Sequence, residues 1–190
     1  MSLPSIVKNA DEVMEQGHNG DDVLVHTGKV ELKLIEPQST ANEMVEFTTA
    51  MSTMSGDMIE KLFAIEAVLL QMPQIEIPLR HCFGNKVYVR EMTAPKGFIL
   101  IGKLHKFKQV NIVVRGDISV LTEDGWKRMK SGDMFESPAG VKRALVTHEE
   151  TVWTTICGTE ETDIDKAENE LTIGSYQEFL QYKGDSLWLS

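Results

Sequence analysis

Two stretches of the chain are framed by glycines, and they constrain the fold more than any other feature. One runs from Gly97 to Gly116, and the other begins at Gly132 and contains Pro138 and Gly140. Between these residues lie short apolar and β-branched runs, which are typical of strands. Glycine permits the tight turns that join short strands, and proline fixes an extended entry into one. The pattern therefore predicts a β-sandwich or a β-barrel.

Alternation of apolar and polar residues extends this β region from residue 75 to residue 156, and strands are also expected within residues 23–35. Short helices are expected over residues 5–16, over residues 162–171 and after Ser175. We divide the chain into three parts: an N-terminal strand and helix extension (1–73), a barrel (74–158) and a C-terminal helical tail (159–190).

The two glycine-framed stretches resemble the two sequence motifs of the cupin family. The positions of the first motif fall on Gly97, Lys103, His105, Gln109 and Gly116. The positions of the second motif fall on Gly132, Pro138, Gly140, Arg143 and Thr147. The resemblance implies a mainly β fold, a cupin-type double-stranded β-helix or jelly-roll barrel, with a long-helix extension at the N-terminus and short C-terminal helices.

Most of the metal ligands of the family are replaced in this chain. In the family, three His and one Glu point into the barrel and hold a divalent metal. The matching residues here are Lys103, His105, Gln109 and Arg143. Two cations and a neutral amide are poor ligands, and a single His does not hold a transition metal against competition. We therefore expect no metal and no other cofactor at the motif.

The same residues suit an anion. Strand alternation places the first three of them on one face, and the resemblance places Arg143 opposite. Arg supplies a planar fork and Lys a point charge for a carboxylate, a phosphate or a nucleotide. In the alternative reading, the two cations reach the rim or pair with Glu136 or Glu91, and the barrel holds no ligand.

Catalysis has less support in the sequence. His105 would act as a general base with Tyr88 as the acid, as His does in metal-free sugar-nucleotide epimerases of the cupin type. Such a His needs a carboxylate partner, and none is readable in the sequence. There is also no Ser-His-Asp grouping, phosphate loop or zinc spacing. We assign no catalytic residue.

A longer resemblance points to a narrower group. Residues 74–180 resemble small cupin-like proteins of tailed bacteriophages and prophages. The segments that carry it are 89–97, 101–106, 111–125, 137–143 and 148–156. The resemblance implies a protein of the host bacterial cytoplasm or the virion, and no settled activity.

Residues 40–72 carry a helical pattern that ends at Pro73. Thr40 and Glu43 fit a capping box, and Gly56 would split the segment, with Ser55 or Asp57 capping a second helix. The helix lies against its own barrel or pairs across subunits in a homodimer or homotrimer; the methionines favour an adaptable interface. Its apolar positions are Met44, Phe47, Met51, Met54, Met58, Leu62, Ile65, Leu69 and Met72.

Composition excludes several classes of partner. The formal net charge of −10 disfavours general nucleic-acid binding, which needs a cationic footprint. No secretory signal and no bilayer-spanning run is apparent. Cys82 and Cys157 are expected to be reduced thiols on two strands.

These observations predict a non-catalytic, homo-oligomeric protein that acts by binding, as a virion or assembly component. The alternatives are a binder of an anionic small molecule, such as a nucleotide, and a cupin enzyme that is metal-dependent or epimerase-like.

Overall fold

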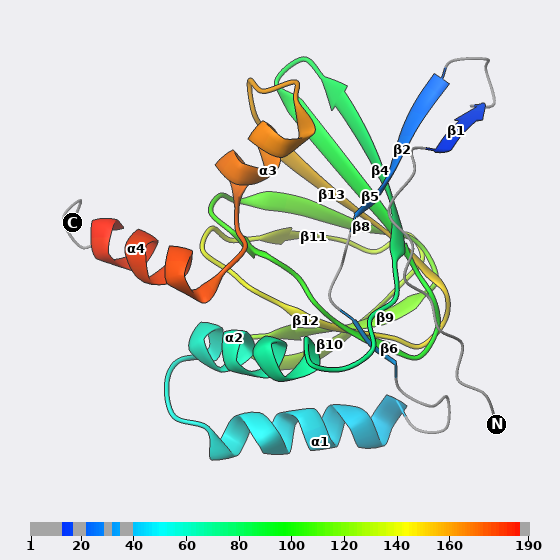
Figure 1. Ribbon diagram of the computed structural model, residues 1–190. Helices are drawn as coiled ribbons and strands as arrows, with labels where there is room; N and C mark the ends of the chain where they lie inside the picture. Colours follow the sequence, from blue (N-terminus) through cyan, green and yellow to red (C-terminus); the bar gives the residue numbers. More distant parts are fainter. Residues whose placement is uncertain (1–12, 17–21, 29–31, 35–39, 187–190) are drawn as a thin grey trace.

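Two antiparallel sheets dominate the molecule, with helices packed outside them (Figure 1). The structure is a computed structural model that describes residues 13–16, 22–28, 32–34 and 40–186. The seven-stranded sheet has the order β1 (Val13–Gln16), β2 (Asp22–Gly28), β4 (Ile77–Gly84), β5 (Val87–Ala94), β13 (Thr151–Gly158), β8 (Gln109–Arg115) and β11 (Met134–Ser137). The expected mainly β jelly-roll barrel is confirmed.

The second sheet faces the first and completes the barrel. It has the order β10 (Gly125–Lys130), β9 (Asp117–Thr122), β12 (Ala144–Thr147), β6 (Phe98–Ile101) and β3 (Leu32–Leu34). A two-stranded ladder joins β7 (Leu104–His105) to β14 (Thr172–Ile173), which belongs to the C-terminal tail. Leu100, Val120 and Trp153 belong to the buried core between the two large sheets.

The framing glycines adopt the backbone conformation that their spacing suggests. Gly116 has φ +102°, and a Cβ there would clash with the Glu150 carbonyl oxygen and with Thr151. A side chain would therefore force apart the β8–β9 corner and the start of β13. The other framing glycines that also have positive φ are Gly97, Gly132 and Gly140.

The N-terminal helical segment is split as its sequence predicts. Helix α1 (Thr40–Thr53) and helix α2 (Met58–Leu69) are separated at Gly56, which has φ +100°. Asp57 caps α2: its Oδ1 accepts from the Glu60 backbone N at 2.9 Å, and Glu60 Oε2 accepts from the Asp57 N at 3.2 Å. The proposed Thr40 capping box lies outside the described side chains.

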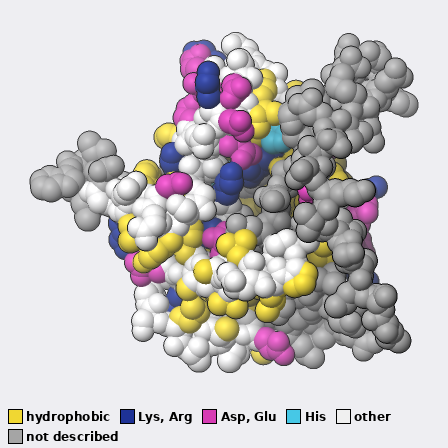
Figure 2. Space-filling model, in the orientation of Figure 1, with side chains coloured by type: hydrophobic (Ala, Val, Ile, Leu, Met, Phe, Trp, Pro, Cys, Tyr) yellow, Lys and Arg dark blue, Asp and Glu magenta, His cyan; other side chains and the backbone are white. Residues whose placement is uncertain are grey.

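Both helices lie along the outer face of the five-stranded sheet (Figure 1). Phe47 of α1 and Leu62 of α2 share one buried cluster with Ile99, Leu121 and Val146 of the barrel. This supports the alternative in which the helices lie against their own barrel. Apolar side chains remain exposed on the visible face over these helices (Figure 2), so pairing across subunits remains a prediction.

The expected helix over residues 5–16 is wrong for residues 13–16. These residues form β1, which pairs antiparallel with β2. The polar and apolar residues of this segment fit either period, and the partner strand selects the extended form. Residues 5–12 lie outside the described ranges.

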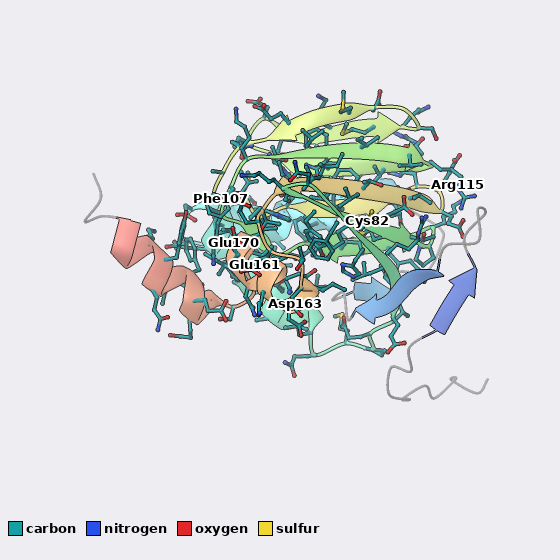
Figure 3. All side chains as sticks on the ribbon, turned by 90° about the horizontal axis from the view of Figure 1, so that it is seen from above. Cys82, Phe107, Arg115, Glu161, Asp163 and Glu170 are labelled. Atoms are coloured by element: carbon teal, nitrogen blue, oxygen red, sulfur yellow. The ribbon has the colours of Figure 1, made fainter. Side chains whose placement is uncertain are left out.

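The C-terminal tail contributes helix α3 (Ile164–Leu171) and helix α4 (Tyr176–Ser186). Asp163, rather than the expected Thr162, caps α3. Figure 3 shows acidic side chains, including Glu161 and Glu170, grouped around α3. Helix α4 packs on α2, where the Phe179 ring lies 5.5 Å from the Phe63 ring. Helix α3 packs against β5 and β13, and α4 contacts α2 and β7.

Two further expectations concern the thiols and the membrane. Cys82 on β4 and Cys157 on β13 are free thiols on separate strands, as expected. None of the helices in the described ranges is long and apolar enough to cross a bilayer.

Candidate ligand-binding site

A cavity of about 260 Å³ opens inside the barrel, and all four predicted site residues line it. They come from three parts of the barrel: Lys103 and His105 lie just before and at the end of β7, Gln109 begins β8, and Arg143 precedes β12. The motif spacing thus brings together residues that the chain separates. The apolar part of the lining consists of Leu79, Met92, Leu100, Ile101, Val141, Leu145 and Trp153.

Arg143 is the cation that is least neutralised at this cavity. Its side chain is 12% exposed, and its Nη1 donates to the Leu121 carbonyl oxygen at 3.1 Å. Its Nε donates a long hydrogen bond to Ser137 Oγ at 3.4 Å. The carboxylate of Glu123 is 3.7 Å away and 63% exposed, so water screens this pair. The guanidinium is therefore only partly neutralised by a carboxylate.

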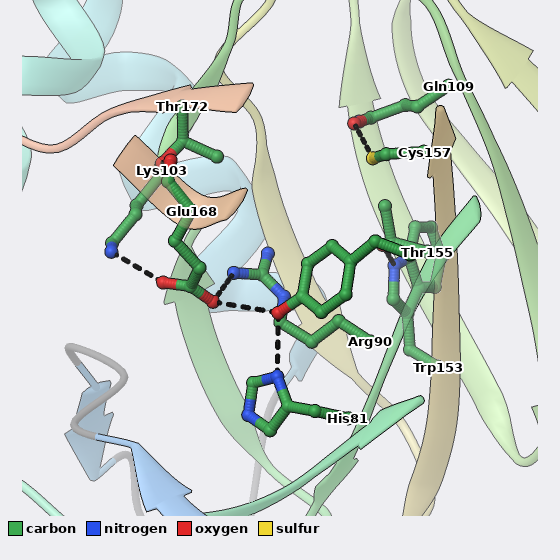
Figure 4. Close-up of polar contacts among 10 residues, drawn as sticks. His81, Arg90, Lys103, Gln109, Trp153, Thr155, Cys157, Glu168 and Thr172 are labelled. Carbon is green, nitrogen blue, oxygen red and sulfur yellow. Dashed lines mark hydrogen bonds and ion pairs between the residues drawn. The ribbon is translucent and has the colours of Figure 1, made fainter. Parts of the chain in front are cut away.

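Lys103 has a partner that the sequence did not reveal. Its Nζ lies 2.9 Å from Glu168 Oε2, and Arg90 Nη1 lies 2.9 Å from Glu168 Oε1 (Figure 4). Burial alone would raise the pKa of Glu168, but Arg90 and Lys103 hold it at about 2. The carboxylate from α3 therefore neutralises much of the positive charge at this end of the cavity.

The alternative pairing of the two cations with Glu136 or Glu91 is wrong. Glu136 pairs with Lys108, and Glu91 pairs with Arg80. Both carboxylates point away from the cavity lining, because the strands that carry them place these side chains on the outer face.

His105 is the residue with unmet hydrogen-bonding capacity. Its Nδ1 is the buried side-chain nitrogen that finds no hydrogen-bond partner among the described residues. The pKa of His105 is lowered to about 3, mainly by burial. The positive charges of Arg90, Lys103 and Lys142 lower it as well, whereas the negative charge of Glu168 opposes the shift. The ring is therefore neutral near pH 7.

The side chain of Gln109 makes a hydrogen bond to another residue of the protein. Its Oε1 accepts a weak bond from the Cys157 thiol at 3.7 Å (Figure 4). Burial raises the pKa of this thiol, so it stays protonated. Gln109 is 6% exposed and therefore has limited access to a ligand.

A chain of paired polar groups crosses the cavity wall, and the sequence analysis missed it. Trp153 Nε1 donates to Thr155 Oγ1 at 3.1 Å, and Thr155 Oγ1 donates to Asn111 Oδ1 at 2.9 Å. Asn111 Nδ2 then donates to Ser137 Oγ at 3.1 Å. The same Ser137 Oγ also accepts a hydrogen bond from Arg143 Nε. Asn111 lies two residues after Gln109, so strand alternation was the signal that would have found it.

Tyr88 does not lie in the lining of the main cavity. Its hydroxyl lies 2.6 Å from His81 Nδ1 and donates to Glu168 at 3.3 Å. Burial, with Glu168, raises its pKa further. The hydroxyl is thus already engaged, and the buried Nδ1 of His105 has no hydrogen-bond partner within the described chain. The geometry does not support a His105 and Tyr88 acid–base pair.

The residues at the motif positions do not fit the metal of the family. Lys103 and Arg143 carry positive charge, and Gln109 is occupied by Cys157. Within the described ranges, no group of three His, Cys, Asp or Glu side chains is placed to hold a metal ion.

Comparisons with known proteins give distant structural likenesses. No protein-family model and no curated protein matches the chain. A cupin-2 domain protein from Shewanella frigidimarina is 20% identical, over 42% of this chain and 78% of its own, with a TM-score of 0.37. A putative ethanolamine utilization protein EutQ from Salmonella typhimurium is 13% identical, over 82% and 99%, with a TM-score of 0.43. Neither likeness carries a conclusion about this chain; the jelly-roll barrel is established by the sheet order of the structure itself.

Proposed function

We propose that the protein binds a small organic anion inside the barrel, with Arg143 as its counter-ion. The observation that carries this proposal is the convergence of Arg143, Lys103 and His105 on one cavity, in a chain whose formal net charge is −10. A mostly buried guanidinium whose paired carboxylate, Glu123, is exposed and 3.7 Å away favours an anionic ligand, because a ligand carboxylate would replace the water lost on burial.

The size of the cavity favours a small acid over a nucleotide. A volume of about 260 Å³ lies just below the range of about 300–1,000 Å³ that is usual for sites of drug-sized ligands. A nucleotide would leave its base or its sugar outside the barrel, whereas a monocarboxylic acid with a modest side chain fits within it.

The apolar wall indicates the rest of the ligand. Leu79, Met92 and Leu145 line the cavity together with the Trp153 ring. Contact with these groups would remove apolar ligand surface from water at about 25 cal/mol per Å². The preferred ligand is therefore a carboxylate with an aliphatic or aromatic body.

Thermal shift and calorimetric titration with a panel of carboxylates and nucleotides test the proposal. We expect aromatic and branched carboxylates to stabilise the protein and nucleotides to have less effect. The substitution Arg143→Gln should weaken carboxylate binding at least tenfold. Arg115→Gln is the matched control, because Arg115 is exposed and pairs with Glu150 away from the cavity. Unchanged binding by the Arg143 variant, or no binding of any anion to the wild type, would sink the proposal.

A role as a homo-oligomeric virion or assembly component is our second proposal. It is supported by the resemblance of residues 74–180 to phage cupin-like proteins and by the exposed Val45 and Val68 on α1 and α2. Mass spectrometry of purified virions tests it, and consistent absence of the chain would contradict it. The ligand proposal is independent of this result.

A further inference from the structure

We infer that the ligand is an amphiphilic monocarboxylate that enters the barrel tail first. Its carboxylate stays near the mouth of the cavity beside Arg143, and its apolar tail fills the closed end. The inference rests on the proposed function and deepens it, because it names the class of the ligand and its orientation. The length and the polarity of the tail then decide which acids bind.

Side chains that point into the barrel from the seven-stranded sheet form two rows across neighbouring strands. In the polar row, Thr155 of β13 lies opposite Arg90 of β5. In the apolar row, two residues further along the strands, Trp153 lies opposite Met92, which lies opposite Leu79 of β4. Residues two apart on a strand share a face, so both rows face the interior, and they lie roughly 7 Å apart. All five side chains line the cavity.

The five-stranded sheet repeats this division. Arg143 Nε lies 3.4 Å from Ser137 Oγ, which also accepts from Asn111 Nδ2 at 3.1 Å. Asn111 belongs to the polar row, because it lies opposite Thr155. Leu145, two residues after Arg143, lines the cavity within the buried core that also holds the apolar row. The guanidinium of Arg143 is therefore at the level of the polar row.

The polar row lies toward the open end of the cavity. Lys103, whose side chain is 46% exposed, lines the cavity together with Glu168 of α3 and Gly174 after β14. At the opposite end, Ile77 and Ala94 follow two residues beyond the apolar row on β4 and β5. Both are fully buried in the core and close that end. The cavity is therefore polar at its mouth and apolar at its blind end.

This arrangement decides the orientation of the ligand. In the described part of the chain, no charged side chain lines the blind end, and the Trp153 N–H already donates to Thr155 at 3.1 Å. A carboxylate buried there would have no partner, which is costly. An apolar tail would instead be removed from water, and each added CH₂ group should tighten binding about fourfold. The side chains at the blind end are Leu79, Met92, Leu100, Leu145 and Trp153.

Calorimetric titration of the full chain with butanoate, hexanoate, decanoate and adipate tests the specificity. We expect affinity to rise from butanoate to hexanoate and to rise no further for decanoate, because its tail exceeds the depth of the blind end. Adipate carries a second carboxylate in place of the terminal methyl group of hexanoate. It should bind at least tenfold more weakly than hexanoate, because that carboxylate would be buried without a partner.

A pair of methionine variants separates a role in specificity from a structural role. Met92→Ala enlarges the blind end, so the preference should move toward acids longer than hexanoate. Met134→Ala is the matched control, because Met134 is 66% exposed on β11 and does not line the cavity. It should keep the preference of the wild type. A purely structural effect of Met92→Ala would weaken all the acids without moving the preferred length.

Tryptophan fluorescence tests the orientation directly. A bromine atom quenches an indole that it contacts, and Trp153 lies in the apolar row beyond Thr155 on β13 (Figure 4). Hexanoate brominated at its terminal carbon should therefore quench strongly, and hexanoate brominated beside its carboxylate should quench less. Trp153→Phe removes the reporting ring, so the difference between the two acids should vanish.

The outcomes distinguish the inference from the function on which it rests. If adipate binds as tightly as hexanoate, or if the bromine beside the carboxylate quenches more strongly, the inference is overturned and the proposed function stands. If no acid binds, both fail. Should Met92→Ala not fold, the adipate comparison and the fluorescence of the wild type decide the inference without it.

Discussion

Charged residues at the cavity are neutralised to different extents. Glu168 lies between Arg90 and Lys103 and cancels much of their charge. Lys142 is fully buried and pairs with Glu66 at 2.7 Å. Arg143 pairs at 3.7 Å with Glu123, whose side chain is 63% exposed. A cation at a motif position is therefore not necessarily available to a ligand. Its availability depends on how close its nearest carboxylate is and on how deeply that carboxylate is buried.

The neutral state of His105 makes stability depend on pH. An unfolded His has a pKa of about 6.5, whereas His105 in the folded protein has a pKa of about 3. As the pH falls from 7 to 5, the unfolded chain takes up a proton that the folded chain does not. The free energy of unfolding should therefore fall by about 2 kcal/mol from this residue alone, with full stability above pH 6.5.

Urea unfolding at pH 7 and pH 5 measures this effect. In the His105→Leu variant, the decrease in the free energy of unfolding that His105 causes between pH 7 and pH 5 should be absent. His148, whose pKa burial also lowers, contributes equally to both proteins and cancels in the comparison. An identical loss in wild type and variant would show that His105 is not held neutral.

Sequence reasoning could place the site but not its partners. Motif spacing and strand alternation placed Lys103 and Arg143 at one cavity. The partners lie far along the chain: Lys103 and Glu168 are 65 residues apart, and Lys142 and Glu66 are 76 apart. Both carboxylates sit on helices, and which helix face docks on the barrel depends on packing that no local pattern encodes.

At the scale of elements, the start of α2 was predictable because its signals are local. Gly56 adopts a left-handed conformation, and Asp57 and Glu60 satisfy backbone N–H groups over a span of four residues. The assignment of residues 13–16 failed for the opposite reason, because a partner strand selects their conformation.

The cap should contribute measurably to stability. Asp57→Ala removes the acceptor for the Glu60 N–H and is expected to lower the free energy of unfolding by about 1 kcal/mol. Asp57→Ser retains an acceptor and should lose less. Glu46→Ala, on an exposed position of α1, is the control and should stay within about 0.5 kcal/mol of wild type. Equal stability of Asp57→Ala and wild type would show that the cap is not formed.

The buried Lys142 and Glu66 pair fixes α2 to the barrel. Lys142 Nζ also donates to the Gly102 carbonyl oxygen at 2.9 Å and lies 4.3 Å from the centre of the Phe63 ring. Removing one partner leaves an uncompensated buried charge, so Glu66→Leu should destabilise the protein by about 3–5 kcal/mol. Adding Lys142→Met should recover part of this loss.

A double-mutant cycle of unfolding free energies measures the coupling. The exposed pair of Lys86 and Glu160 is the matched control and should show coupling of at most about 1 kcal/mol. Additive effects of Glu66→Leu and Lys142→Met would show that the two charges do not act as a pair.

At the scale of the whole molecule, the helical extension and the barrel share a core. Phe47, Met51 and Leu62 pack with Ile101 and Ala144 of the five-stranded sheet in one cluster. The predicted boundary at residue 73, between the N-terminal extension and the barrel, therefore does not separate two independent hydrophobic cores. Removal of the helices would expose one face of the sheet to water.

The oligomeric state is the remaining prediction at this scale. We expect a homodimer or homotrimer in light scattering coupled to size exclusion. The apolar residues that α1 and α2 keep exposed, Val45 (65%) and Val68 (59%), would lie in the contact, because burying them removes apolar surface from water. Val45→Glu and Val68→Glu should therefore shift the mass to that of one chain without lowering the unfolding temperature of the monomer.

Val87→Glu provides the control for this experiment. Val87 is an exposed apolar residue at the start of β5, away from α1 and α2, so its substitution should leave the mass unchanged. A wild-type mass of one chain at every concentration would contradict the prediction. The helices would then serve only their own barrel, and the exposed valines would be ordinary surface residues, which single apolar side chains often are.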